Sequence, residues 1–97
     1  MGTIQHDYVI ATTCSNEIEN NFLDWLDYDA RRYCFYIGCE ANNFRTFIMI
    51  PSGWKVENTY ERNKYNRIRE SFLEFLATNR VHPIRVSDGE LGFKVER

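Results

Sequence analysis

Two stretches with helical periodicity alternate along this chain with stretches rich in β-branched and aromatic residues. Apolar side chains recur at helical spacing in 17–28 and again in 59–78, which predicts an amphipathic helix in each range. Strands are predicted around these helices, in the ranges 8–12, 33–38, 44–50, 81–86 and 91–95. The predicted order is therefore β-α-β-β-α-β-β.

This order, with its short connections, predicts an α+β fold. The expected architecture is a two-layer sandwich, in which an antiparallel or mixed sheet of four to five strands carries both helices on one face. A chain of 97 residues is short for two separate cores, so a single domain over 1–97 is expected. Asp88-Gly89 predicts a hairpin turn, and the alternation that follows is expected to point Leu91, Phe93 and Val95 toward the core.

The ends of the two helices also carry sequence signals. Ser15 and Asn16 are both suitable N-cap residues for the first helix. Asn16 and Glu19 have the spacing of a capping-box variant. For the second helix, Asn79 is the expected C-cap.

Charge is divided unevenly along the chain, although the net charge is only −2. Residues 45–97 hold ten basic and seven acidic side chains, whereas residues 1–30 hold no Lys or Arg. Six acids lie in 1–30: Asp7, Glu17, Glu19, Asp24, Asp27 and Asp29. The helix dipole accounts for acids in the first turn, but it disfavours those near the C-terminal end of the predicted helix.

Three acids of the first predicted helix lie opposite its apolar stripe and form an acidic face: Glu17, Asp24 and Asp27. Asp24 and Asp27 are neighbours at i,i+3, and Glu17 lies two turns earlier, roughly 10 Å along the axis. Such carboxylates can approximate a row of phosphates and attract a basic surface on a partner. The simpler alternative is that these acids only keep the protein soluble.

Known motifs for cofactors, phosphates and membranes do not occur in the sequence. There is no GxxxxGK[ST] and no GxGxxG, so no cofactor is expected. No stretch approaches the roughly 20 apolar residues of a membrane span, and no secretory signal is recognisable, which predicts a cytoplasmic protein without membrane contact.

The cysteines raise two further possibilities. Cys34 and Cys39 have a spacing compatible with zinc, but no second pair exists, so buried apolar cysteines are expected and no metal site. Cys14 precedes the first predicted helix, where the dipole favours a thiolate. A small cysteine-dependent enzyme, with His6 or His82 as base, therefore remains an alternative.

Nucleic-acid binding is a second alternative. The order β-α-β-β-α-β resembles the RNA recognition motif, in which aromatic residues on the central strands stack on bases. Tyr8-Val9-Ile10 and Phe44-Arg45-Thr46-Phe47-Ile48 are loosely similar to its two strand motifs. The basic side of the second helix could contact phosphates through Arg62, Lys64, Arg67 and Arg69. The sequence pI of about 5.6 makes direct nucleic-acid binding the less favoured reading.

In general character the chain is similar to small inhibitor proteins of phages and mobile elements, including anti-CRISPR proteins. It shares with them its small size, its lack of cofactor motifs and its many Asn, Tyr and acidic residues. The resemblance implies a non-enzymatic, stoichiometric inhibitor that occupies a basic nucleic-acid-binding surface of a host protein or nucleoprotein complex. It implies carboxylates that stand in for phosphates, with polar and aromatic contacts beside them: Glu17, Asp24, Asp27 and Asp29, then Asn20, Tyr28 and Trp54. The opposite charges of the two halves also permit self-association.

Overall fold

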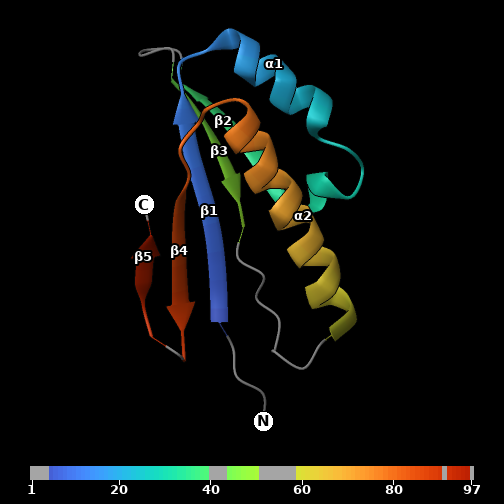
Figure 1. Cartoon of the computed structure of the whole chain (residues 1–97), viewed down its shortest axis with the longest axis vertical. Coiled ribbons are helices and arrows are strands. Elements are labelled where there is room, and N and C mark those ends of the chain that lie inside the picture. The colour runs from blue at the N-terminus through green and yellow to red at the C-terminus, as the bar shows by residue number, and fades with distance from the viewer. Residues whose placement is uncertain (1–4, 40–43, 51–58, 91, 97) are drawn as a thin grey trace.

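The computed structural model describes residues 5–39, 44–50, 59–90 and 92–96, and it has an α+β fold in two layers (Figure 1). The strands pair antiparallel in one sheet with the order β2-β3-β1-β4-β5. They are β1 (Gln5–Thr13), β2 (Cys34–Cys39), β3 (Phe44–Met49), β4 (Ile84–Gly89) and β5 (Lys94–Glu96). Two α-helices, α1 (Asn16–Trp25) and α2 (Thr59–Thr78), lie on one face of this sheet, and a short 3₁₀-helix, η1 (Ala30–Arg32), leads into β2. The predicted fold class and element order are confirmed.

Phe22 of α1 lies at the centre of the core. Its side chain is fully buried, and its ring centroid is 4.4 Å from that of Phe47 on β3. The rings of Phe72 and Phe75 on α2 lie 6.1 and 6.0 Å away. The Phe22 ring of α1 thus contacts both β3 and α2. Burial of this aromatic cluster holds the two helices against the sheet.

Ser15 begins α1 as predicted, but the expected capping box does not form. The Ser15 hydroxyl accepts a hydrogen bond from the backbone N–H of Ile18 at 3.2 Å. Asn16 is the first helical residue, and both it and Glu19 instead bind Arg45 of β3. The side chains that could have formed the box are thus used to connect α1 to the sheet.

The first helix ends at Trp25, three residues earlier than predicted. Leu26 is its C-cap and has an extended conformation, with ψ at 92°. The chain then turns, and the Asp27 carboxylate accepts a hydrogen bond from the backbone N–H of Ala30 at 2.8 Å, just as η1 begins. This local bond offers the backbone an alternative to another helical turn.

The second helix has the predicted bounds and the predicted C-cap. Beyond Asn79, the backbone N–H of Val81 donates to the carbonyl of Leu76 at 2.9 Å, and that of Arg80 donates to Ala77 at 3.1 Å. This pair of bonds is a Schellman motif. It requires a left-handed residue, and Arg80 supplies it with a φ of 59°.

The fourth strand begins later than predicted, at Ile84. Val81 is 7% exposed, because the Schellman motif turns it into the core before the strand begins. Asp88 and Gly89, predicted to form a turn, still belong to β4, and Asp88 pairs with His6 of β1.

The direction in which β5 points its apolar side chains also differs from the prediction. Val95 pairs with Val86 of β4 and lies on the sheet face away from the helices, where it is 45% exposed. Phe93 is 69% exposed, and Leu91 lies outside the described residues. The register with β4, which a sequence pattern does not specify, decides which face each residue occupies.

Candidate interaction surfaces

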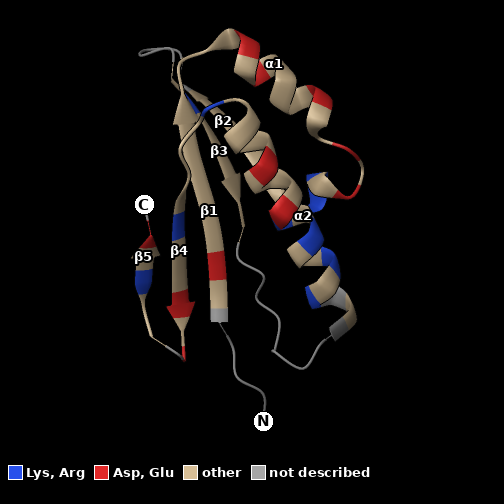
Figure 2. Cartoon of the chain, in the orientation of Figure 1, with Lys and Arg blue, Asp and Glu red and all other residues tan. Residues whose placement is uncertain are grey.

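The outer side of α1 carries two carboxylates that the fold does not use. Glu17 and Asp24 are exposed and lie seven residues apart, so they are on the same side of the helix about 10 Å apart along its axis. Asn20 is exposed between them. Within the described part of the chain, neither carboxylate has an ion-pair partner. In Figure 2, α1 carries acidic bands and no basic band, whereas α2 carries both. We call Glu17, Asn20 and Asp24 the acidic face of α1.

Asp27 and Asp29 do not extend this face, because α1 ends before them. Asp27 binds the backbone N–H of Ala30 within the turn. The Asp29 carboxylate is 3.3 Å from the ammonium group of Lys64 on α2, with half of its side chain exposed. The expectation of one continuous acidic helix face is therefore wrong, and part of the acidic segment instead meets the basic helix within the same molecule.

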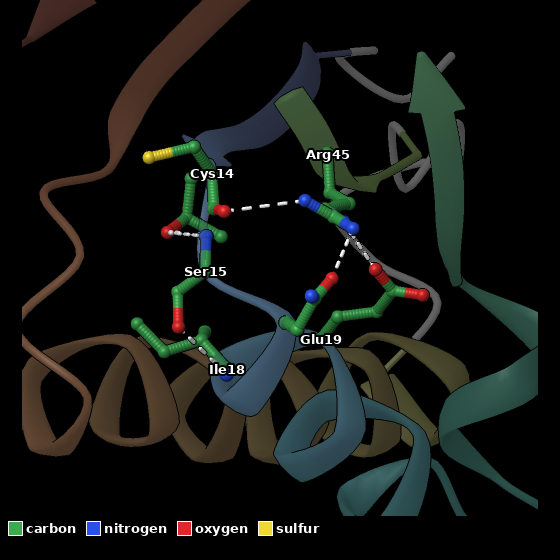
Figure 3. A network of polar contacts seen from close by, with 7 residues as sticks. Cys14, Ser15, Ile18, Glu19 and Arg45 are labelled. Atoms are coloured by element: carbon green, nitrogen blue, oxygen red, sulfur yellow. Dashed lines mark hydrogen bonds and ion pairs between the residues drawn. The ribbon is translucent and has the colours of Figure 1, made fainter. Parts of the chain in front are cut away.

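Glu19 points toward the sheet and belongs to a structural network (Figure 3). Arg45, on the helix side of β3, forms an ion pair with Glu19 and donates to the side-chain oxygen of Asn16. It also donates to the backbone carbonyl of Cys14 at 3.2 Å. Sequence reasoning assigned Arg45 to a possible nucleic-acid motif, whereas its guanidinium holds the start of α1 on the sheet.

Two aromatic residues were predicted as partner contacts. Tyr28 is 78% exposed, and its ring lies 5.7 Å from the guanidinium carbon of Arg32. This cation–π contact orients an otherwise free ring near the end of α1. Trp54 lies outside the described residues.

The four basic residues predicted for nucleic-acid binding do not share one side of α2. At 100° per residue, Arg62 and Arg69 lie on one flank, and Lys64 and Arg67 lie almost opposite them. Lys64 and Arg67 line a cavity of about 250 Å³ together with Asp27 and Asp29. A single phosphate-binding stripe along this helix is therefore not formed.

Arg69 faces the sheet margin that the helices leave uncovered. It lines a cavity of about 220 Å³ with residues of β1, β4 and β5, namely Asp7, Tyr8, Arg85, Val86, Ser87, Lys94 and Glu96. Its Nε atom is buried and has no hydrogen-bond partner among the residues that the structure describes. Glu96 binds both Arg85 and Lys94, at 3.2 and 3.0 Å, and the hydrogen bond from Lys94 holds the pKa of Glu96 below its usual value.

The face of the sheet opposite the helices is apolar, and nothing described covers it. Cα partners across an antiparallel pair lie on the same face, so the register identifies its members. We call this surface the open sheet face: Tyr8, Ile10, Thr12, Phe35, Ile37, Phe44, Thr46, Ile48, Ile84, Val86 and Val95, with His6 and Asp88 at one end. Of the aromatic residues compared with the RNA recognition motif, Tyr8 and Phe44 lie on it, but Phe47 lies in the core.

Aromatic residues on the sheet were predicted only as a possible base-stacking surface. The apolar surface across all the strands was not predicted, although a signal was present. Cys34-Phe35-Tyr36-Ile37 is apolar at every position, and so is Phe47-Ile48-Met49-Ile50. A strand with one solvent-exposed face alternates between apolar and polar residues, whereas a continuous apolar run is typical of a strand that is covered on both faces.

The cysteines lie in different surroundings. Cys34 is buried in the core, where burial, aided by the charge of Asp27, raises the pKa of its thiol to about 12. Cys14 is exposed before the N-cap, and in the described part of the molecule no hydrogen bond joins its thiol to His6 or His82. Among the same residues, no three His, Cys, Asp or Glu side chains gather into a possible metal site.

Comparison with known proteins does not assign the chain to a family. The chain matches no protein-family model, no curated protein and no solved structure. Within the described ranges, neither helix is long and apolar enough to span a membrane.

Proposed function

We propose that this protein acts by binding a basic surface of another protein, with the acidic face of α1 as the contact and without a catalytic step. Tyr28, exposed three residues beyond the end of the helix, supplies an aromatic contact. A protein that acts in this way occupies a surface stoichiometrically, which is the mode of action of the phage-type inhibitors that the chain resembles in character.

Asp24 is the observation that carries the proposal. It is the second-last residue of α1, and the last turn holds no basic residue that could balance it. A carboxylate at this end opposes the helix dipole and costs about 0.3–1 kcal/mol of stability. Asp24 is also exposed and forms no ion pair with the described residues. A side chain that weakens its own helix and forms no ion pair with the described residues has the properties expected of a binding residue.

The charge pattern favours a basic partner over a nucleic acid. Glu17 and Asp24 repel phosphates, and they increase the rate of encounter with a basic groove. The cations that could bind phosphates are separated on α2, where Lys64 pairs with Asp29. The described outward positions of the open sheet face also include no Lys or Arg, which a base-stacking surface needs nearby for phosphate contacts.

The test is a charge reversal with a matched control. A partner is captured from cells that make the protein and is purified, and its affinity for the wild type is measured as a function of salt. Glu17→Lys combined with Asp24→Lys should weaken the complex at least about tenfold at low salt and flatten its salt dependence. Glu70→Lys combined with Glu90→Lys makes the same change in net charge on exposed positions outside α1. The affinity of this control variant for the partner should be within about twofold of the wild-type affinity.

Two results of the affinity measurement would count against the proposal. One is equal loss of affinity in both double variants, which would indicate a dependence on net charge alone. The other is wild-type affinity in the α1 variant, which would place the contact elsewhere. If immobilised nucleic acid retained the wild type in a salt-sensitive way, direct nucleic-acid binding would replace this proposal.

A further inference from the structure

Several apolar side chains on the open sheet face are exposed to solvent. Phe35 is 45% exposed, Ile37 58% and Phe44 49%, on the β2–β3 side of the sheet. On the β4–β5 side, Ile84 is 39% and Val95 45% exposed. These residues come from both margins of the sheet, and the partly buried Ile10 and Ile48 on the central strands connect them into one surface.

Aromatic side chains present roughly 150–250 Å² each and aliphatic ones somewhat less, so these exposed fractions leave on the order of 500 Å² of apolar surface. The patch is thus as large as the biggest apolar patch expected on a typical monomer. Two such faces in contact would bury on the order of 1,000 Å² or more, which reaches the lower limit for a specific interface.

The charge on this face is compatible with a second copy of itself. Its described outward positions carry no Lys or Arg, and the acid and the imidazole, Asp88 and His6, lie together at one end. Two copies can therefore meet without placing like charges at the centre. The continuous apolar runs of β2 and β3 are also the pattern of strands covered on both faces.

We propose that a second copy of this chain covers the open sheet face, sheet against sheet, across a two-fold axis. Self-complementary contact of identical patches is the usual geometry of a homodimer. Aligned packing of two sheets, about 10 Å apart, would let the outward side chains interdigitate. The helix layers then lie on the outside, and each copy keeps its acidic face of α1 exposed. The inference does not rest on the proposed function.

Two other modes of self-association predict different behaviour. Edge pairing through β2 is possible because Cys34–Cys39 is an edge strand without charged residues, whereas β5 is short and carries Lys94 and Glu96. Head-to-tail association of the acidic and basic helices would depend on charge. An apolar sheet-to-sheet dimer involves β4 as well as β2, and it persists in about 1 M salt, where charge interactions are screened within about 3 Å.

The test is sedimentation of the full chain over a range of concentrations, at low and high salt. The wild type should form dimers with a Kd on the order of 10 µM in both conditions. Ile84→Asp, away from the β2 edge, should raise the Kd at least about tenfold, because it would bury an unpaired carboxylate. Leu23→Asp makes the same kind of change at an apolar position of α1 that is 46% exposed, and it should dimerise like the wild type.

A measurement on the wild type keeps the test independent of the folding of any variant. On dilution, methyl resonances of Ile10, Ile48 and Ile84 should shift, while those of the buried Leu76 should not. A wild type that stays monomeric at every concentration would overturn the proposal, as would dimers that Ile84→Asp leaves intact. Dimers that dissociate in high salt would instead identify the head-to-tail mode. A wild type that stays monomeric would leave the proposed function standing, because the test of that function changes residues outside the open sheet face. Head-to-tail dimers would bear on both proposals, because they cover the acidic face of α1.

Discussion

Some residues of this chain make contacts that cannot be predicted from their neighbours in the sequence. Arg45 follows an aromatic residue in a strand and resembles part of a nucleic-acid motif, yet it binds Glu19 and the start of α1. Tyr65 fits the helical stripe and is buried as predicted, but its hydroxyl also lies 2.8 Å from the carbonyl oxygens of both Asp7 and Ile50, which share its one proton. The helical pattern predicts that Tyr65 is buried. It does not predict the hydrogen-bond partners of Tyr65 or Arg45, because those partners come from distant segments.

Arg80 offers a prediction at the scale of one residue. It adopts a left-handed conformation with φ at 59°, which costs a non-glycine residue on the order of 1 kcal/mol. Arg80→Gly should therefore raise the free energy of unfolding by about 0.5–1 kcal/mol, since glycine is the usual residue at this point of a Schellman motif. Urea denaturation measures the change. A destabilised variant would mean that the Arg80 side chain makes a contact worth more than the strain.

Burial of Cys34 and Tyr65 predicts how stability depends on pH. The thiol pKa of Cys34 rises from 9.0 to about 12, and burial raises the pKa of the Tyr65 hydroxyl as well. Both groups are neutral when protonated, and burial favours the neutral form. Their contribution to the free energy of unfolding is therefore complete below their unfolded pKa values and is lost as the pH rises above about 9. Chemical denaturation at several pH values should show this decline. Cys34→Ala should make it shallower, and an unchanged slope would contradict the assignment.

At the scale of elements, sequence patterns predicted most of what the structure contains. The bounds of α2 and the positions of β2 and β3 follow from helical spacing and β-rich runs, because those signals are local. The end of α1 could not be predicted, since it depends on the bond between Asp27 and Ala30. The face to which β5 points Val95 could not be predicted either, because the β4–β5 register decides it.

Asp24 gives a prediction at the scale of its helix. The C-terminal turn of α1 holds this carboxylate and no basic residue. Asp24→Asn removes the charge at nearly constant size, so it should raise the free energy of unfolding by about 0.3–1 kcal/mol, and less at high salt. Thermal unfolding at two salt concentrations measures the effect. A loss of stability would mean that Asp24 has a favourable contact in its own chain.

At the scale of the molecule, each layer leaves one surface that the fold does not use. The helix layer leaves the acidic face of α1, with Glu17 and Asp24 exposed. The sheet layer leaves the open sheet face, to which each of the five strands contributes at least one apolar residue. The acidic face follows from the uneven charge of the sequence, although only part of the acidic segment belongs to it. The open sheet face required the strand register, because apolar runs alone do not show that one side lacks a cover.

The affinity of the Asp24→Asn variant for the purified partner tests the proposed function most directly. Asp24 is proposed to weaken its own helix and to bind a basic partner surface, so stability and affinity should change in opposite directions. The predicted result is a more stable protein whose complex is several-fold weaker at low salt and closer to wild type at high salt. A variant that is more stable and binds its partner as tightly as the wild type at every salt concentration would contradict the proposal.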